Sequence, residues 1–245
     1  MKSLGIFSKW IASGLAVAAL LVATSAQAAS GKARVHAVRG TATYSAQGGE
    51  WKTLLAGAVL GSGASIKTGV NSQVDLGMGD NGATVILLSD TTLGLEKLNY
   101  EGTGVDVVIE TLLDLTVGTI QGNVKQMAAA SKYEVKTPQA LFAIKGTEQG
   151  TQYQITAGGK LDVIKGSVIA AYGQPPRTTT VNAGQTFVPP AAPTAQPTVR
   201  PTEPTEVPPS IPDSFPAPPI AAAPVTAPPP VEFVSPGSGK AASGG

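Results

Sequence analysis

An all-β fold, either a sandwich or a barrel, is predicted for residues 29–188 by three features of this 245-residue chain. Apolar residues recur there with a period of two rather than 3.6, in short segments rich in Val, Ile, Thr and Tyr. Turn residues separate these segments roughly every ten positions, as in sandwiches and barrels. Of the 20 prolines, all but Pro138, Pro175 and Pro176 follow Val188, so the hydrophobic core must come from the residues before it.

The N-terminal residues 1–28 have the three-part layout of a cleavable signal peptide. Lys2 and Lys9 form a basic start, an apolar run covers residues 11–23, and small side chains stand at Ala26 and Ala28. The rival interpretation, an uncleaved membrane anchor, needs roughly 20 apolar residues, and this run is shorter. We therefore expect cleavage after Ala28 and an exported chain, periplasmic or secreted, that does not span the membrane.

Short strands are expected along the whole domain, and a hairpin is the clearest local signal. Asn81-Gly82 stands between two apolar runs, and this dipeptide favours a type I′ turn because both turn residues need positive φ. The expected strands include residues 35–44, 73–76, 83–88, 133–136 and 161–164.

Residues 105–117 fit two kinds of element. Asp106, Glu110 and Asp114 recur every four residues, which aligns them on one face of a helix and equally on one face of a strand. The odd positions are apolar except for Thr111, and this alternation favours a strand whose acids point outward. Residues 126–131, which contain three alanines, are the one segment expected to form a helical turn.

Residues 189–245 are expected to form a disordered, proline-rich tail after the folded domain. Pro, Ala, Thr and Val dominate, and apolar residues such as Ile211, Phe215 and Phe233 stand singly. Such a segment cannot bury enough apolar surface to offset its ordering entropy. Its proline density favours extended polyproline II, a spacer of about 3.1 Å per residue.

Composition excludes several classes of function. A formal charge of +1 argues against a strongly basic nucleic-acid binder. The absence of cysteine removes disulfides, thiolate metal sites, iron–sulfur clusters and thiol nucleophiles. His36 is the single histidine, so a site built from several imidazoles is excluded as well. We expect no metal, no cofactor and no nucleic-acid partner.

Three groups of residues invite a catalytic or metal-binding interpretation, and each has a simpler one. Asp75 and Asp80 flank a glycine-rich hairpin and lack the alternating oxygen ligands of a calcium loop. Asp106, Glu110 and Asp114 invite comparison with glycosidase carboxylates, but outward acids on an amphipathic strand are commoner. The serines lie outside any Gly-x-Ser-x-Gly motif. We predict that the chain is not an enzyme.

Four stretches carry motifs of one known family, in that family's order. The most specific are Tyr-Glu-Val-Lys-Thr-Pro at residues 133–138 and Ile-Lys-Gly-Thr at residues 144–147, where the family usually has Arg in place of Lys145. The other stretches lie within residues 60–76, 82–95 and 159–185. Together they resemble the FecR domain over roughly residues 35–187, which is most of the expected globular part.

This resemblance implies a jelly-roll-like β-sandwich, and a periplasmic module of regulators that sense loaded outer-membrane transporters. Shared glycines and prolines suit turns, where a side chain would clash or φ is positive. The family-motif residues expected to have such a structural role are Thr68, Gly69, Thr137, Pro138, Gly146, Thr147, Gly184 and Gln185.

The expected function departs from that of the family's regulators in one respect. Those regulators place a sigma-binding segment before the membrane helix, whereas only nine residues precede Trp10 and the apolar run here. We therefore expect an exported, non-catalytic module of the bacterial cell envelope that binds an envelope protein or a cell-wall glycan. The alternative is a periplasmic sensor component that relays a signal through a separate membrane or sigma-factor-regulating partner.

Overall fold

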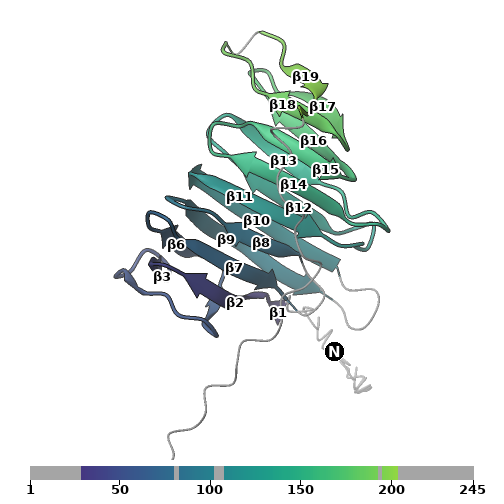
Figure 1. The fold of residues 1–245 in the computed structure, drawn as a ribbon. Helices are drawn as coiled ribbons and strands as arrows, with labels where there is room; N and C mark the ends of the chain where they lie inside the picture. The colour runs from purple at the N-terminus through teal and green to yellow at the C-terminus, as the bar shows by residue number, and fades with distance from the viewer. Residues whose placement is uncertain (1–28, 80–82, 102–107, 193–194, 204–245) are drawn as a thin grey trace, which may run out of the picture.

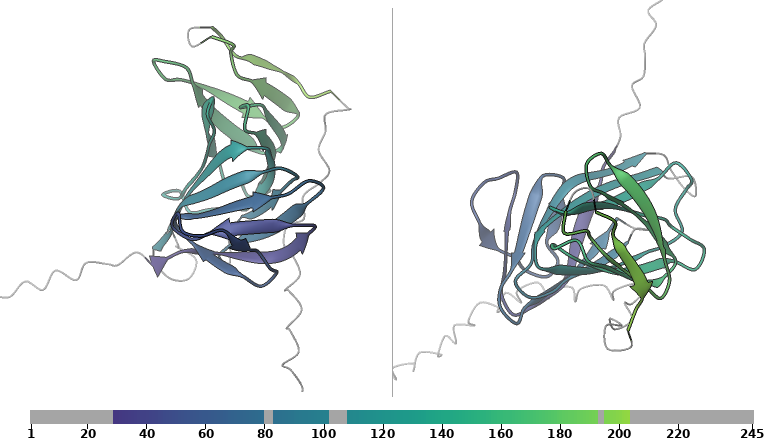
Figure 2. Two further views of the ribbon diagram at one scale, coloured as in Figure 1. Left: turned by 90° about the vertical axis from the view of Figure 1, so that its left-hand side faces the viewer. Right: turned by 90° about the horizontal axis from the view of Figure 1, so that it is seen from above.

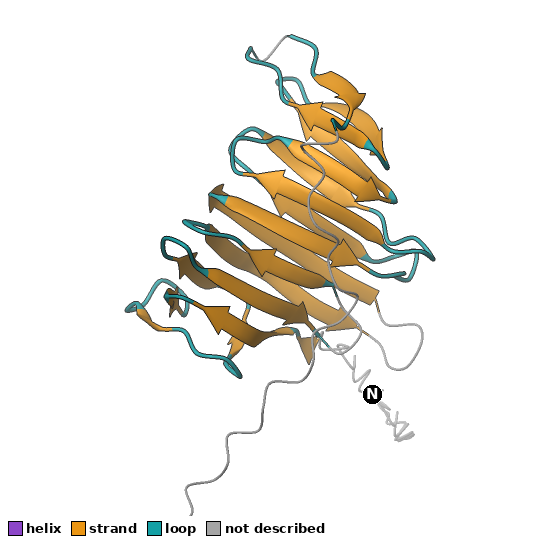
Figure 3. Ribbon diagram, viewed as in Figure 1, coloured by secondary structure: helices purple, strands orange, loops and turns teal. Residues whose placement is uncertain are grey.

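Two large β-sheets pack face to face to form the molecule (Figure 1, Figure 3). The computed structural model describes residues 29–79, 83–101, 108–192 and 195–203. These residues contain no helix, and one cluster of buried apolar side chains fills the space between the sheets. The predicted all-β, jelly-roll-like sandwich is confirmed.

Each sheet is a stack of short strands. Sheet A has the order β17 (Arg177–Asn182), β16 (Ser167–Tyr172), β13 (Ala140–Ile144), β12 (Lys132–Lys136), β10 (Val108–Val117), β9 (Thr92–Glu101), β6 (Ala64–Thr68), β3 (Ala42–Ser45) and β4 (Lys52–Thr53), with β1 (Ala29–Ser30) paired to β9. Sheet B has the order β19 (Thr198–Pro201), β18 (Gln185–Val188), β15 (Leu161–Lys165), β14 (Thr151–Thr156), β11 (Thr119–Val124), β8 (Thr84–Leu87), β7 (Gln73–Met78), β2 (Lys32–Arg39) and β5 (Val59–Gly61).

The chain climbs this stack from β2 and β3 to β19 and passes repeatedly from one sheet to the other (Figure 1). We call the two edges of the sandwich at which it crosses the first edge and the second edge. The first edge carries the crossovers at residues 40–41, 54–58, 69–72, 88–91 and 118. The second edge carries those at residues 62–63, 125–131, 145–150, 166 and 183–184.

One pair of neighbouring strands, β10 and β12, is parallel, whereas the other described pairs are antiparallel. The chain crosses to sheet B after β10 and returns to sheet A after β11. β12 therefore starts at the same edge as β10 and runs in the same direction. From β10 through β11 to β12 the chain therefore makes one full turn around the core, and this turn joins the strands before β11 to those after it. The view from above shows the strands arranged around that core (Figure 2).

Both sheets contribute large side chains to the core over its whole height. Ile66 and Phe142 from sheet A and Leu76, Tyr153 and Phe187 from sheet B are all fully buried. Burial of one such side chain stabilises the fold by about 1.5–3 kcal/mol.

The described part of segment 105–117, residues 108–117, adopts the strand conformation favoured by its alternation. In β10, Ile109, Leu113 and Leu115 are buried, and Glu110 and Asp114 lie on the outer face. Asp106 lies outside the described residues.

Two other segments differ from expectation. Residues 35–44 form two strands, because Gly40, with φ of 78°, and Thr41 carry the chain from sheet B to sheet A. Residues 126–131 form a turn in which Ser131 N donates to Ala128 O at 2.9 Å, and no helical turn. This segment must span from β11 in one sheet to β12 in the other, so tertiary geometry overrides the helix propensity of its alanines.

The expected strands at 73–76, 83–88, 133–136 and 161–164 are present as β7, β8, β12 and β15. β7 and β8 pair antiparallel, as expected for a hairpin, and Met78 N donates to Ala83 O at 2.8 Å. The turn residues Asn81 and Gly82 themselves lie outside the described residues.

Sheet B continues beyond Val188, where the folded domain was expected to end. β19 pairs antiparallel with β18, and Thr202 N donates to Gly184 O at 2.8 Å. A short run with Val199 and Arg200 can join the sheet after the prolines because β19 is an edge strand. At an edge, Pro201 need not donate a hydrogen bond to a neighbour.

Candidate functional site

Two of the family-motif residues, Thr68 and Gly69, lie at the first edge. Thr68 Oγ1 donates to Leu88 O at 2.6 Å and accepts from Thr91 N at 2.9 Å. Gly69 N donates to Thr41 O at 2.9 Å, and a Cβ on Gly69 would overlap the Thr41 side chain. Thr68 is therefore hydrogen-bonded to the crossover at residues 88–91, and Gly69 to the crossover at residues 40–41.

Two further buried hydroxyls extend these contacts along the first edge. Ser72 Oγ accepts from Thr41 N at 2.9 Å, and Thr91 Oγ1 accepts from Thr119 N at 3.1 Å. We call Thr68, Ser72 and Thr91 the hydroxyl ladder, because they link the successive crossovers of the lower stack. Sequence analysis gave Thr68 a structural role; Ser72 lies in the motif stretch within residues 60–76 but received no role there, and Thr91 was not singled out.

The remaining motif residues lie at other turns. Thr137 N donates to Ala140 O at 2.9 Å and Thr137 Oγ1 accepts from Ala140 N at 3.1 Å, which closes the β12–β13 hairpin around Pro138. Gly146 and Thr147 lie in the crossover from β13 to β14, where Thr147 Oγ1 donates to Gly150 O at 2.9 Å.

The last two motif residues form the turn that leads from β17 to β18. Gly184 has φ of 74°, and Gln185 Oε1 accepts from Asn182 N at 2.9 Å. All eight motif residues thus lie at turns or beside them, and the structural role expected for them stays a prediction that mutation can test.

The acids weighed as catalytic or metal-binding residues have basic partners instead. Asp75 Oδ2 lies 3.2 Å from Arg39 Nη1, and Glu110 Oε1 lies 2.7 Å from Lys97 Nζ. Asp114 Oδ2 lies 4.0 Å from Lys136 Nζ, while Asp80 and Asp106 are outside the described residues. Within the described part of the chain, His, Asp and Glu side chains do not gather into a group that could hold a metal ion.

A small cavity at the second edge has room for about one water molecule. Met78, Thr111, Met127 and Tyr133 are among its lining residues. Thr111 Oγ1 is buried and finds no hydrogen-bond partner among the described residues. The space is too small for an organic substrate, so it offers no active site.

Two buried tyrosines meet beside this cavity. The Tyr133 and Tyr153 hydroxyls lie 3.3 Å apart and share a hydrogen bond. Burial raises the pKa of both phenols well above the ordinary value, and the neighbouring Tyr153 raises that of Tyr133 further. Both therefore stay neutral at physiological pH and serve the core.

The outer face of sheet A is charged and faces water. Its ion pairs join half-exposed side chains, such as Lys97 with Glu110 and Lys136 with Glu96 at 3.2 Å. The hydrogen bond from Lys136 to Glu96, with the charges of Asp114 and Glu96, raises the pKa of Lys136. Exposed pairs of this kind contribute only about 0–1 kcal/mol each.

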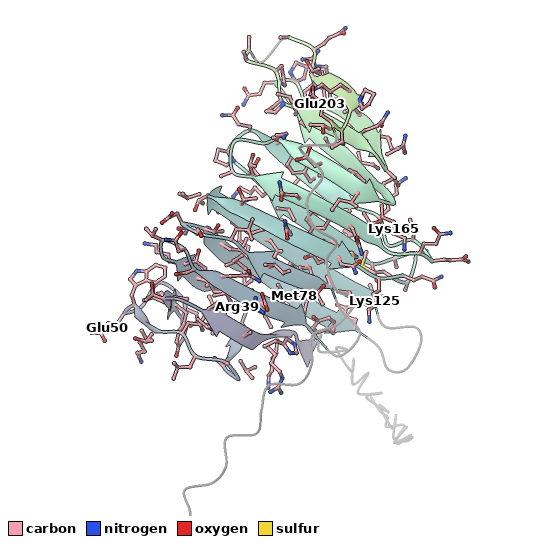
Figure 4. The ribbon with its side chains drawn as sticks, in the orientation of Figure 1. Arg39, Glu50, Met78, Lys125, Lys165 and Glu203 are labelled. Carbon is pink, nitrogen blue, oxygen red and sulfur yellow. The ribbon has the colours of Figure 1, made fainter. Side chains whose placement is uncertain are left out.

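The outer face of sheet B is polar but almost excluded from water. We call it the polar face; Arg39 and Lys165 mark its two sides in Figure 4. One row of neighbours in register crosses six strands: Asp75, Ile86, Gln121, Gln154, Asp162 and Thr186. A second row consists of Gly77, Thr84, Asn123 and Gln152.

The lower end of the stack carries exposed apolar side chains. Trp51 is 45% exposed, Leu55 67% and Val59 46%, and we call these three residues the apolar end. Trp51 precedes β4 and Val59 begins β5, so they flank the last strand of each sheet. Leu55 lies in the crossover between these strands. Lys67 Nζ lies 4.1 Å from the Trp51 ring centroid in a cation–π contact.

Comparison with known proteins gives one family match. Residues 64–169 match the family model described as FecR protein. Among curated proteins, no match to this chain was found. Within the described residues, no helix is both long and apolar enough to span a membrane.

Proposed function

Because residues 64–169 belong to the FecR family, we propose that this chain is an exported, non-catalytic binding module of the bacterial cell envelope. FecR domains are periplasmic, sensor-type regulatory modules that work with membrane or sigma-factor partners. Cleavage of residues 1–28 is part of the proposal. It is supported by the small side chains of Ala26 and Ala28, which a signal peptidase requires before the cut.

The observation that carries the binding role is the apolar end. Large exposed apolar groups that lie together on a protein surface mark interaction sites, and tryptophan is enriched among the residues that dominate binding energy. The cation–π contact with Lys67 on one side of the Trp51 ring favours one orientation of the ring before a partner arrives. Little side-chain entropy then remains to be lost on binding.

The composition of the apolar end favours a protein over a glycan. Leu55 and Val59 carry no group that hydrogen-bonds sugar hydroxyls, whereas they suit the apolar core of a protein interface. We therefore propose an envelope protein as the partner, with binding to cell-wall glycan as the outcome that would overturn this choice.

Capture from envelope extracts by the mature chain tests the proposal. Trp51→Ala and Leu55→Ala are expected to abolish capture with an unchanged melting temperature, because both side chains are exposed. Val117→Ala is the matched control, since Val117 is 53% exposed but ends β10, which is separated from β4 by three strands of sheet A. Equal capture by all three variants, or retention on purified peptidoglycan alone, would contradict the proposal.

Family membership supports a second candidate, a sensor component that relays a signal through a separate membrane or sigma-factor-regulating partner. Deletion of the chain is then expected to change expression from a sigma-dependent reporter, and Trp51→Ala to reproduce the change. An unaltered reporter in both strains would reject the relay while leaving the binding role standing.

A further inference from the structure

We propose that β17 is a dimerisation strand, which pairs antiparallel with β17 of a second copy of this chain and joins the two sheets A into one. β17 ends sheet A at the upper end of the stack, whereas the apolar end lies at the lower end (Figure 1). Dimerisation through β17 is therefore independent of the proposed binding function.

β17 differs from the other three strands that end the two sheets. An end strand presents unpaired N–H and C=O groups, and proteins protect such strands by making them very short or by placing proline or charged residues in them. β4 has two residues and β5 three, and β19 contains Arg200 and Pro201. β17 has six residues without proline, and it pairs with β16 over its whole length without a register shift. Among the described residues, β17 is thus the one long end strand without such protection.

The open backbone groups of β17 follow from its register with β16. In an antiparallel pair, residues that bond to the neighbouring strand alternate with residues whose N–H and C=O groups point away from it. Ala183 N donates to Gly166 O at 3.0 Å, so the odd-numbered residues of β17 bond to β16 in the same register. The even-numbered residues, Thr178, Thr180 and Asn182, therefore point their backbone groups toward the open side.

Only two of these three residues keep a free amide. Asn182 N donates to Gln185 Oε1 at 2.9 Å, so this end of the strand is already closed. The amides of Thr178 and Thr180 have no acceptor among the described residues, and both residues are exposed. The open side of β17 thus offers two amides and the carbonyl groups beside them.

Thr178 and Thr180 are spaced so that they pair with a second copy of themselves. A two-fold axis at Thr179 places Thr178 opposite Thr180 of the second copy, and Thr180 opposite Thr178. Each of these pairs exchanges two N–H···O=C bonds, as hydrogen-bonded pairs of an antiparallel ladder do. Both open amides of each chain are then satisfied, and threonine side chains lie opposite one another, which is a favourable cross-strand pair.

The single charge of β17 does not oppose this pairing. Arg177 Nη2 donates to Ala195 O, and the guanidinium lies 5.2 Å from the Tyr172 ring centroid, so both contacts hold it within its own chain. In the proposed register Arg177 stands opposite Val181 of the second copy. The two arginines are then four residues apart along the ladder, or about 14 Å, which exceeds the screening length of about 8 Å at physiological ionic strength.

Sheet B favours a whole second copy over a single added strand. Val199 in β19 is in register with the buried Phe187, so its side chain lies on the inner face of sheet B. It is nevertheless 37% exposed, and β19 is the last strand of that sheet. The two-fold axis is perpendicular to sheet A, so it brings β19 of the second copy toward β19 of the first and covers Val199. A lone extended peptide on β17 would leave Val199 exposed.

The dimer carries its two apolar ends at opposite extremities, because each lies at the far end of its stack. If the apolar end binds an envelope protein, the dimer engages two partner molecules at once and gains avidity. This consequence rests on the proposed function, whereas the dimer itself does not.

Single cysteines test the register, because the parent chain has none. In the proposed pair the two copies of Thr179 are directly opposite, with Cα atoms about 4.5 Å apart, which a disulfide can span. The two copies of Thr178 are offset by two residues, so their Cα atoms are about 8 Å apart, too far for a disulfide. After oxidation of the mature full-length chain with diamide, Thr179→Cys is expected to form covalent dimers at least about tenfold faster than the matched control Thr178→Cys. Equal rates, or faster cross-linking of the more exposed Thr178→Cys, would overturn the proposal.

Sedimentation of the mature full-length chain tests the association itself. The parent is expected to pass from one chain to two chains per particle as its concentration rises from about 1 μM to about 1 mM. Thr180→Pro removes an amide that points to the open side, where an end strand tolerates proline, so this variant is expected to fold but to stay a monomer. Thr180→Val keeps the amide and is the matched control, expected to dimerise like the parent.

Melting curves establish that each variant is folded, and if Thr180→Pro does not fold, Thr178→Pro takes its place. A folded proline variant that dimerises like the parent would overturn the proposal. A parent chain that stays a monomer over the whole concentration range would overturn it too, and would leave β17 to a strand of another protein.

Discussion

Gly146 lies where the second edge leaves no room for a side chain. A Cβ there would come within 2.6 Å of Lys125 O and 2.8 Å of Met127 N, and both are backbone atoms that cannot turn aside. Gly146→Val is therefore expected to lower the free energy of unfolding by about 1–3 kcal/mol. Chemical denaturation followed by circular dichroism measures the change.

Lys145→Ala is the control for Gly146→Val, because the neighbouring Lys145 side chain is exposed. Its effect on stability is expected to stay within about 0.5 kcal/mol, with partner capture unchanged. If Gly146→Val melts like the parent while Lys145→Ala loses the partner, the crossover is a binding site and the packing interpretation is wrong.

The buried tyrosine pair makes stability depend on alkaline pH. In the unfolded chain a tyrosine ionises near pH 10, whereas burial raises the folded-state pKa of Tyr133 and Tyr153 above that value. The unfolded state therefore binds fewer protons above pH 10, and the free energy of unfolding falls as pH rises. The slope is about 1.4 kcal/mol per pH unit for each tyrosine.

Tyr133→Phe isolates this effect. Between pH 10 and 11 the variant is expected to lose less stability than the parent, by about 1 kcal/mol over that pH unit, because half of the unfolded tyrosine is already ionised at pH 10. Urea denaturation at pH 8, 10 and 11 gives the two slopes. Identical slopes would show that Tyr133 ionises as easily in the folded protein as in the unfolded one.

Crossovers between sheets are the elements that need support in this fold, because they leave backbone groups outside the strand ladders. At the first edge the hydroxyl ladder provides it. Thr91 is fully buried, and its Oγ1 accepts a hydrogen bond from the Thr119 amide. The Thr91 amide in turn donates a hydrogen bond to Thr68 Oγ1.

Thr91→Val tests the ladder. Valine has nearly the same shape but leaves the Thr119 amide without its acceptor, so the free energy of unfolding is expected to fall by about 1–3 kcal/mol. Thr116→Val is the matched control, because the Thr116 hydroxyl is exposed and its contact with Thr92 O is long, at 3.4 Å. Equal melting temperatures for both variants would show that the hydroxyl ladder does not stabilise the fold.

For the molecule as a whole, β19 is the last strand among the described residues. A chain covering residues 29–203 retains β19, and one covering residues 29–188 loses it together with its bonds to β18. Both are expected to melt cooperatively, the shorter with a free energy of unfolding lower by about 1–3 kcal/mol. A molten or insoluble 29–188 chain would mean that β19 is needed for folding.

Export makes a separate prediction about the mature protein. N-terminal sequencing of the exported chain is expected to begin at Ala29, because Ala26 and Ala28 provide the small side chains that a signal peptidase requires. Exported protein that still begins at Met1 would contradict this.

Local pattern was enough to identify the class of fold and many of its turns. The alternation in residues 105–117 follows directly from strand geometry, since neighbouring side chains point to opposite faces. Gly184 could be assigned to a turn because its positive φ is a property of the residue and its immediate neighbours. Such features depend on contacts close in sequence, and a single sequence records them.

The polar face, the hydroxyl ladder and β19 could not be predicted from the sequence. Gln121 meets Gln154, and Thr68 meets Thr91, only because strands and crossovers far apart in the chain lie side by side. A period of two says that a side chain alternates, but it cannot say which sheet a strand joins or which residue stands opposite. Those choices minimise the exposed apolar surface of all the strands together, so they exist only in the assembled sandwich.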